Sequence, residues 1–187
     1  MECGLHIPTG PTKSWTDHDV PVHPMRWENR MIEKTALIHD ALDRVEDPEI
    51  AIGLRDLGVL REVQVTDSHV QVRLVPTRVA CPGRALMASR VREAIESVDP
   101  SLAVEIVWDH ESWGPTDISP VGCSILVDQG FVAKSTSDPV CPYCGGHDLR
   151  PAGDFGGSLC KRPFTCRECG STVDMLSGAS LPVVSVT

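Results

Sequence analysis

Two Cys-x-x-Cys pairs are the residues whose type and spacing most directly suggest a chemistry. They are Cys141-Pro142-Tyr143-Cys144 and Cys166-Arg167-Glu168-Cys169, and 21 residues lie between them. Two thiolates three positions apart on a turn can face the same way and hold one tetrahedral ion at about 2.3 Å. Glycines follow each pair and let the backbone curl until amide groups face the sulfurs. We therefore predict structural zinc on Cys141, Cys144, Cys166 and Cys169, with a redox dithiol or a rubredoxin-like iron site as alternatives.

The segment around these cysteines, residues 138–176, has the features of a zinc ribbon. Residues 149–164 can form its hairpin, which we expect to turn near Gly156-Gly157. The segment has few apolar residues, so metal binding is expected to supply much of its folding free energy. Cys160 is a fifth thiol here, either a small buried hydrophobe or a substitute ligand. The segment's net charge of −1 and three aromatic residues provide no basic stripe and no stacking platform for nucleic acid.

A second candidate is the single thiol of Cys81, which follows the segment Thr77-Arg78-Val79-Ala80 and precedes Pro82. Pro82 suits the first turn of a helix, which would place Cys81 at or near the helix N-cap. A thiolate at a helix N-terminus has a lowered pKa and a raised reactivity or metal affinity. Thr77 follows a predicted strand and could donate a hydrogen bond to the same sulfur. On this pattern alone, an inert capping thiol is the alternative interpretation.

Apolar residues recur at helical spacing in two segments and at alternating or strand-like spacing in three. Their order is helix, hairpin, helix, strand, which predicts a small α+β domain with helices on one sheet face. The proline of Asp47-Pro48 ends the first helix, and Asp67-Ser68 supply the hairpin turn. The helical patterns cover residues 31–47 and 82–98, and the strand patterns cover 59–65, 70–74 and 102–108.

The rest of the chain divides into an arm, a connection and a tail. The N-terminal 27 residues hold four prolines without apolar periodicity, and we interpret them as an extended or disordered arm. A connecting region covers residues 113–130, with a short helix expected near 124–129, and residues 135–139 form a polar linker. The predicted units are an arm (1–27), an α+β domain (28–134), a zinc ribbon (138–176) and a tail (177–187).

The composition limits the partners and the compartment. The 187 residues carry a net charge of −9, which disfavours nucleic acid or an anionic membrane surface as a partner. No apolar run approaches the roughly 20 residues needed to cross a bilayer. The first residues lack the basic-then-apolar order of a secretory signal, so we expect a cytoplasmic location. Thiols stay reduced there, and the eight cysteines then indicate a metal site rather than disulfides.

Two acidic motifs, Asp47-Pro48-Glu49 and Asp56-Leu57-Gly58, lie between the first helix and the hairpin. On their own they are typical of turn-forming residues. The sequence has no Ser/His/Asp order, phosphate-binding glycine loop or nucleotide fingerprint to accompany them. Residue spacing alone therefore does not assemble a catalytic constellation.

Together these motifs resemble a known family. The acidic motifs and the Thr77-to-Cys81-Pro82 segment, on a helix–hairpin–helix–strand chain, resemble the metal–sulfur cluster biosynthesis domain of the SufT-like, MIP-type family. The stretch Trp113-Gly114-Pro115-Thr116-Asp117-Ile118-Ser119-Pro120 and a ribbon with Phe155-Gly156 and Cys160-Lys161 narrow the resemblance to PaaD-like accessory proteins of phenylacetate catabolism. The resemblance covers about residues 31–176.

The resemblance implies iron–sulfur cluster assembly or delivery to client subunits, an oxygenase or its reductase, in a multicomponent CoA-thioester oxygenase system or a homologous pathway. It implies that Cys81 makes transient contact with iron or a labile iron–sulfur cluster. Asp47, Glu49, Asp56 and Thr77 match the positions that surround this thiol. Because a cluster usually needs four thiolates, a second subunit in a homodimer or a bound small thiol is expected to contribute.

Two other functions stay open. In the first, the protein is an enzyme that uses Cys81 as a nucleophile or sulfur carrier in a biosynthetic pathway, which requires a base or orienting group near the thiol. The sequence names no histidine neighbour for that role. In the second, the protein is a zinc-ribbon adaptor that only docks partners, and Cys81 is dispensable.

Overall fold

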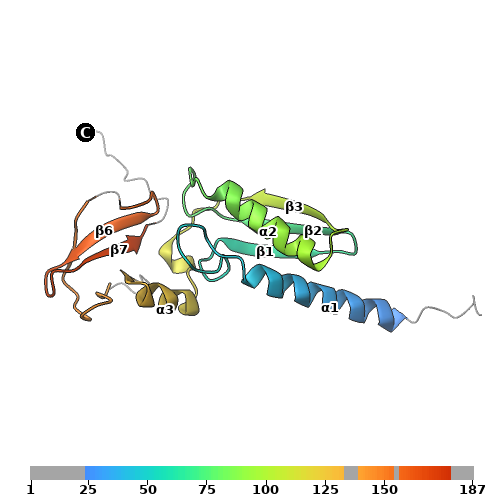
Figure 1. The fold of residues 1–187 in the computed structure, drawn as a ribbon, viewed down its shortest axis with the longest axis horizontal. Coiled ribbons are helices and arrows are strands. Elements are labelled where there is room, and N and C mark those ends of the chain that lie inside the picture. The colour runs from blue at the N-terminus through green and yellow to red at the C-terminus, as the bar shows by residue number, and fades with distance from the viewer. Residues whose placement is uncertain (1–23, 133–138, 154–155, 178–187) are drawn as a thin grey trace, which may run out of the picture.

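The computed structural model describes residues 24–132, 139–153 and 156–177. Most of the predicted arm, linker and tail lies outside these residues, as does Phe155. The last four residues of the predicted arm, 24–27, belong to the first helix. An α+β unit is followed by a smaller β unit (Figure 1), which confirms the predicted fold class.

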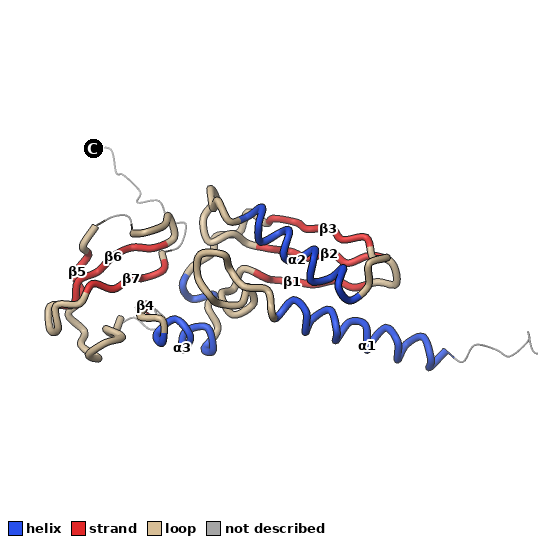
Figure 2. The backbone as a smooth tube through the Cα atoms, in the orientation of Figure 1, coloured by secondary structure: helices blue, strands red, loops and turns tan. Residues whose placement is uncertain are grey.

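A three-stranded sheet forms the larger unit. β1 (Leu60–Val65) and β2 (His69–Leu74) pair antiparallel as the predicted hairpin, and β3 (Ala103–Trp108) pairs parallel with β2. A parallel pair needs a crossover connection, and α2 (Arg84–Val98) supplies it. α1 (Pro24–Asp43) contacts α2 and runs beside the sheet (Figures 1 and 2).

The two faces of the sheet differ in polarity. On β2, Val70, Val72 and Leu74 are fully buried, and the residues between them are only partly buried. These intervening positions bear polar side chains that bond to the neighbouring strands, as Gln71 does to Glu105. Because apolar and polar positions alternate, one face packs into the core with the helices and the other faces solvent.

The bounds of α1 differ from the prediction at both ends. The helix begins at Pro24, seven residues before Met31, and ends at Asp43 instead of Asp47. Residues 27–30 near its start are exposed, so they show no buried apolar face that could mark the helix. At the other end, an antiparallel bridge between Glu46 and Gly53 draws the chain into a loop and stops the helix early.

The segment after β3 is attached to the loop before β1. The indole Nε1 of Trp113 donates a hydrogen bond to the carbonyl of Leu57 at 2.8 Å, and the ring is buried. A short 3-10 helix, η1 (Pro115–Asp117), follows and packs against Gly58, whose φ of 75° is left-handed. The connecting region is therefore an ordered part of the core rather than a spacer.

α3 (Pro120–Asp128) begins four residues before the predicted start at residue 124. Its N-cap is Ser119, whose hydroxyl accepts a hydrogen bond from the amide of Gly122 at 2.9 Å. The Ser-Pro pair at the helix start is a common N-terminal signal. This cap extends the helix toward the α+β unit.

The smaller unit is a four-stranded sheet in the order β4-β7-β6-β5. β5 (Leu149–Pro151) and β6 (Lys161–Cys166) form the predicted antiparallel hairpin. β7 (Thr172–Leu176) pairs with β6, and β4 (Phe131–Val132) pairs parallel with β7. Neither β4 nor β7 was predicted. β4 has two residues, too few to show an alternation, whereas polar and apolar residues do alternate in β7 and the prediction overlooked that signal.

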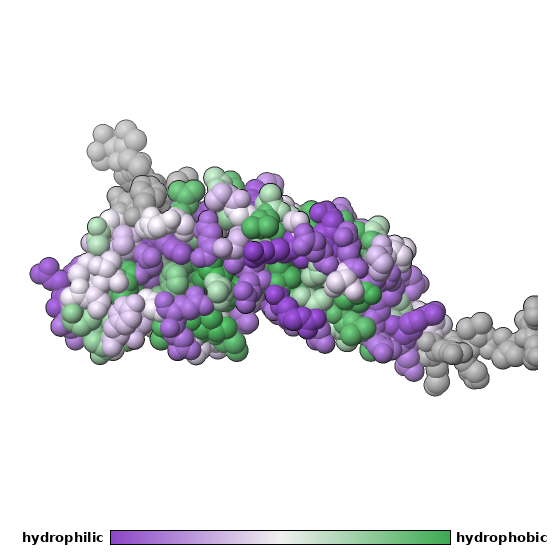
Figure 3. Space-filling model, in the orientation of Figure 1, coloured by the Kyte–Doolittle hydropathy of each residue, from purple (hydrophilic) through white to green (hydrophobic). Residues whose placement is uncertain are grey.

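Two apolar clusters hold the described residues together. The larger one fills the α+β unit and includes Cys160 and Leu176 of the ribbon, so the ribbon packs against that unit. The smaller one surrounds Cys141 and Cys166. Hydrophobic residues are scattered over the face shown in Figure 3. No helix among the described residues is long and apolar enough to span a bilayer.

Substitution of Gly58 by alanine is expected to destabilise the fold. A Cβ at this left-handed position would lie 2.4 Å from the carbonyl oxygen of Asp117. Strain and the clash with η1 should lower the free energy of unfolding by at least about 1 kcal/mol, measured by urea denaturation. Gly157→Ala is the matched control, because no atom lies within 4 Å of its added Cβ. Equal stability of the two variants would contradict the role of this contact.

Candidate functional site

Residues 46–53 form a tight loop that carries two of the predicted site residues. An antiparallel bridge closes the ends of the loop. Inside it, the Oδ1 atom of Asp47 accepts hydrogen bonds from the amides of Glu49 at 2.8 Å and Ile50 at 3.0 Å. This side chain therefore fixes the turn, as aspartates do in Asx-turns, and leaves the Glu49 side chain exposed.

The Asp47 carboxyl is 8% exposed, which is unusual for an acidic group. Burial raises its pKa above the ordinary value of 3.8, and the charge of Glu49 acts in the same direction. The two amide hydrogen bonds and the charge of Lys161 oppose this effect without cancelling it. The Lys161 ammonium belongs to β6 of the ribbon and donates to the Glu49 carbonyl at 3.3 Å. The ribbon thus supplies a cation to the acidic loop.

Cys81 lies two residues before the N-cap of α2, which is Gly83, and not at the cap itself. We predicted a lowered pKa for this thiol, and that prediction is wrong. Burial raises the pKa of Cys81, and the charges of Asp47 and Glu49 raise it further. Hydrogen bonds from the Gly83 amide and the Thr77 side chain act in the opposite direction but do not prevail. The predicted contact between Thr77 and the sulfur is present.

The loop that carries Cys81 (the thiol loop) touches the loop of residues 46–53 (the acidic loop) and is still accessible from outside. Cys81 is partly buried, and the preceding Val79 is 76% exposed. On the inner side, a Cβ on Gly83 would lie 3.0 Å from Cγ of Pro48 and 3.6 Å from the Cys81 sulfur. The absence of a side chain at Gly83 therefore lets the two loops approach each other. The sulfur is neither sealed in the core nor fully in solvent.

Cys160 joins this region from the ribbon, which the sequence did not indicate. Its thiol lies 3.5 Å from Oε2 of Glu49 and 3.1 Å from the hydroxyl of Ser158. Burial raises its pKa to about 11, and the charges of Glu49 and Asp47 contribute to the same shift. The only sequence signal was an extra thiol in the ribbon, and sequence spacing could not assign it to a contact 111 positions away.

Asp56 has a different set of contacts from the other predicted site residues. Its Oδ1 atom accepts a hydrogen bond from the Ser119 hydroxyl at 2.5 Å, and its backbone carbonyl accepts one from the Ser119 amide at 2.9 Å. A Cβ on Gly122 would lie 2.6 Å from that carbonyl. Asp56 therefore anchors the start of α3, and its placement beside Cys81 stays a prediction of the resemblance.

The four predicted ligand cysteines come together in the ribbon. Their sulfur atoms all lie within 4.8 Å of one another, and two of the separations are 3.8 Å (Cys141–Cys169) and 3.6 Å (Cys144–Cys166). Four thiolates at about 2.3 Å from one tetrahedral ion would be about 3.8 Å apart. The arrangement therefore fits a four-thiolate metal site. Hydrogen bonds from Ser171 lower the pKa of Cys169 to about 6, which favours its thiolate form.

The two Cys-x-x-Cys turns of this four-cysteine site, called the cage from here on, are built in the same way. The amide of Gly145 donates to the Cys141 carbonyl at 3.0 Å, and the amide of Gly170 donates to the Cys166 carbonyl at 2.9 Å. Each glycine has a left-handed φ, 73° and 80° respectively, which closes a tight turn around the sulfurs. The glycine after each pair therefore lets the backbone curl at the cage, and the facing of amides toward the sulfurs stays a prediction.

A glutamate from the second cysteine pair links the two halves. Oε1 of Glu168 accepts hydrogen bonds from the amides of His147 at 2.7 Å and Asp148 at 3.2 Å. The carboxylate also occupies the space that a side chain at Gly146 would fill, since a Cβ there would lie 2.4 Å from it. The two turns are thus held together by protein contacts of Glu168.

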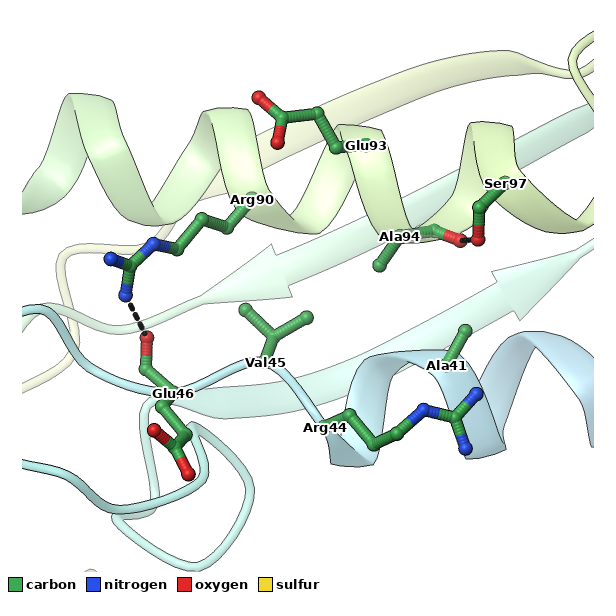
Figure 4. Close-up of a pocket in the computed structure, with 8 residues that line it drawn as sticks. All are labelled: Ala41, Arg44, Val45, Glu46, Arg90, Glu93, Ala94 and Ser97. Carbon is green, nitrogen blue, oxygen red and sulfur yellow. Dashed lines mark hydrogen bonds between the residues drawn. The ribbon is translucent and has the colours of Figure 1, made fainter.

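A surface groove between α1 and α2 is separate from these residues (Figure 4). Ala41, Val45 and Ala94 line it, together with charged and polar residues of α2 and of the segment that follows α1. Its drawn hydrogen bonds join Arg90 to the Glu46 carbonyl at 3.0 Å and Ser97 to the Ala94 carbonyl at 2.7 Å. No cysteine or histidine is among its lining residues. The groove therefore offers no thiol or imidazole for metal or nucleophile chemistry.

Two family profiles match the two units described above. The profile of the family described as iron–sulfur cluster assembly protein matches residues 35–107, and that of the PaaD zinc beta ribbon domain matches residues 128–177. An uncharacterized protein of Methanocaldococcus jannaschii is 34% identical over 77 residues, which cover 41% of this chain and 80% of that protein. The chain belongs to the iron–sulfur cluster assembly protein family. The predicted resemblance is confirmed.

Two further relatives of this family member carry functional names. An Escherichia coli protein, named as a component of 1,2-phenylacetyl-CoA epoxidase, is 24% identical over 143 residues, 71% of this chain and 86% of that protein. A Mycobacterium leprae iron–sulfur cluster carrier protein is 28% identical over 85 residues, 45% of this chain and 22% of that protein. These relatives support a general association with iron–sulfur cluster assembly.

The raised pKa of Asp47 predicts a pH dependence of stability. The folded state binds the proton more tightly than the unfolded state, so this group stabilises the fold below the ordinary pKa of 3.8. That stabilisation is lost as the pH rises through the folded pKa. Asp47→Asn retains an oxygen acceptor for the two amides but removes the titration. The free energy of unfolding of Asp47→Asn should therefore increase relative to that of the wild type as the pH rises.

The measurement is denaturant unfolding of the wild type and Asp47→Asn at pH values from below 3.8 upward through the folded pKa of Asp47. Both proteins keep the same cysteines, so acid-driven loss of metal affects them alike and cancels in the difference. Parallel profiles of unfolding free energy against pH for wild type and Asp47→Asn would show that burial does not shift the pKa of Asp47.

Proposed function

We propose that the protein assembles or delivers iron–sulfur clusters for a multicomponent oxygenase or its reductase, and that the Cys81 thiolate contacts the transferred iron. The observation that carries the proposal is the partly exposed Cys81 thiol in the family's assembly domain. Two hydrogen bonds, from Gly83 and Thr77, are directed at its sulfur. Such bonds stabilise a thiolate once iron replaces the thiol proton.

The surroundings of Cys81 favour transient binding over permanent storage. Burial and the neighbouring carboxylates raise the pKa of Cys81, so its free thiol is protonated near neutral pH. The proton then competes with iron for the sulfur. One thiolate is also too few for a cluster that usually needs four. Further ligands from a second copy, a small thiol or the client would then determine whether the cluster stays or leaves.

The same surroundings argue against Cys81 as a nucleophile. A nucleophilic thiol needs a lowered pKa or an adjacent base. The charged groups that act most strongly on Cys81 are the carboxylates of Asp47 and Glu49, and they raise its pKa. Delivery of iron is the function that these groups support best.

The proposed client is an oxygenase of the phenylacetyl-CoA epoxidase kind, the reductase that serves it, or a homologous system. The support is the likeness to the E. coli epoxidase component, which extends over 71% of this chain, together with the PaaD ribbon profile that matches the C-terminal unit. We further propose that the ribbon's four-thiolate cage holds one structural zinc ion. With all four ligands from the protein, such a cage stabilises the fold and leaves no open position for chemistry.

Cys81→Ala is expected to remove most of the iron–sulfur absorbance that the wild type gains after anaerobic reconstitution with iron and sulfide. The measurement is the visible spectrum together with iron and sulfide content per chain. Cys123→Ala is the matched control, because Cys123 is a buried thiol of α3 outside the cage. Equal cluster content in wild type and Cys81→Ala would contradict the proposal. An adaptor function would then be favoured if client activity also survived the substitution.

Cys166→Ser is expected to lower the zinc content from about one per chain toward zero and to unfold the ribbon, because the cage loses a ligand. Metal analysis and protease sensitivity of residues 139–177 are the measurements, with Cys123→Ser as the control. A ribbon that stays folded without metal would overturn the structural role of the ion.

A further inference from the structure

Cys160 is held between the thiol loop and the acidic loop by contacts on both sides. On one side its sulfur meets the Glu49 carboxylate at 3.5 Å. On the other, its carbonyl accepts a hydrogen bond from the Ser177 amide at 2.9 Å, and the Ser177 hydroxyl accepts one from the Arg78 guanidinium at 2.8 Å. Arg78 belongs to the same loop as Cys81, whose amide donates to the Arg78 carbonyl at 3.0 Å. The ribbon thiol therefore lies where both loops of the α+β unit meet the ribbon.

The two thiols share the same charged neighbours. Asp47 and Glu49 both lie close enough to influence Cys81 and Cys160 electrostatically. Cys160 is a buried member of the larger apolar cluster, and Cys81 packs against that cluster. The Glu49 carboxylate lies 3.5 Å from the Cys160 sulfur, and its charge also acts on the Cys81 thiol. Two thiols and a carboxylate make a mixed sulfur and oxygen donor set, which suits a thiophilic divalent cation such as ferrous iron.

The Arg78 guanidinium, which joins the thiol loop to Ser177, also carries a buried donor that is not satisfied. Its Nε atom is buried and has no hydrogen-bond partner among the described residues. An unpaired buried donor is costly, and a negatively charged ligand can satisfy it. Two thiolates around an iron, or the sulfide of a cluster, carry such a charge.

We propose that Cys160 is the second sulfur ligand of the iron site, so that Cys81, Cys160 and Glu49 bind one thiophilic divalent metal ion at the junction of the two units. This inference rests on the proposed function and adds a ligand from the ribbon to it. Two thiol protons leave as two metal–sulfur bonds form, and no electron is transferred. The ribbon then has two roles, since one thiol completes the iron site and four others hold its own ion.

Metal binding at the junction requires a rearrangement of side chains. Among the residues that the structure describes, only the four cage cysteines already bring three or more ligand atoms within 4.8 Å of one another. Rotation about the side-chain bonds of Cys81 and of the exposed Glu49 would bring donors toward Cys160. Such a site is open until iron arrives, which suits a carrier.

Cobalt(II) added to the zinc-loaded, full-length protein under anaerobic conditions tests this site. Zinc binds four thiolates more tightly than cobalt does, so the cage keeps its zinc. The wild type should bind one further cobalt ion, with sulfur-to-metal charge-transfer absorbance from two thiolates. Cys160→Ser and Cys81→Ser should each keep about half of that absorbance per bound ion and bind at least about tenfold more weakly. Cys123→Ser is the matched control and should behave as the wild type.

A second readout avoids variants altogether. X-ray absorption at the cobalt edge of the wild type reports the junction ion alone, because the cage holds zinc. Two sulfur ligands with additional oxygen support the proposal, and one sulfur ligand overturns it. Zinc content of each variant shows whether its ribbon is still folded.

The outcomes separate this inference from the proposed function. If Cys160→Ser matches the wild type while Cys81→Ser loses cobalt, the ribbon ligand is overturned and the role of Cys81 stands. If the wild type binds no cobalt beyond the zinc cage, the two-thiol site is overturned, and the iron–sulfide reconstitution of Cys81→Ala still decides the proposed function separately.

Discussion

The Asp47 carboxylate accepts hydrogen bonds from two amides inside a loop from which water is largely excluded. Burying an ionised carboxylate is costly, and these bonds recover part of that cost. In return the loop acquires one shape, with Pro48 against Gly83 and Glu49 facing the ribbon. The positions of both thiols relative to the acidic groups depend on this turn.

The ribbon is tied to the α+β unit at several independent places. The Cys160 thiol meets the Glu49 carboxylate, Lys161 donates to the Glu49 carbonyl, and Arg78 donates to the Ser177 hydroxyl. Each of these contacts is modest alone, with a net contribution of about 1 kcal/mol for a typical hydrogen bond. Together with the apolar packing of Leu176 they place the ribbon at the edge of the Cys81 site. A freely tethered ribbon could not present Cys160 to Glu49.

The two groups of thiols are suited to different tasks because their surroundings differ. In the cage, left-handed glycines and the Glu168 bridge close the turns, and the four sulfurs are already near the spacing of a tetrahedral ion. At the junction, Cys81 and Cys160 have raised pKa values, and their donors are not yet gathered. A preformed cage favours permanent binding, whereas an unassembled, protonated site releases its ion more readily.

The sequence alone determined the α+β order, the hairpin of β1 and β2 and the four cage cysteines, because these depend on local periodicity and on short, fixed spacings. It missed β4 and misplaced the ends of α1, since short or exposed elements have little periodicity, and the alternation present in β7 was overlooked. It also placed Cys81 at or near the N-cap of α2, and the structure places it two residues before the N-cap, Gly83. Only the tertiary structure decided the direction of the Cys81 pKa shift, the attachment of Asp56 to α3 and the meeting of Cys160 with Glu49. These depend on burial and on contacts between residues far apart in the chain, which arise only when the chain packs in three dimensions. The contact of Cys160 with Glu49 also requires the two units to pack against each other.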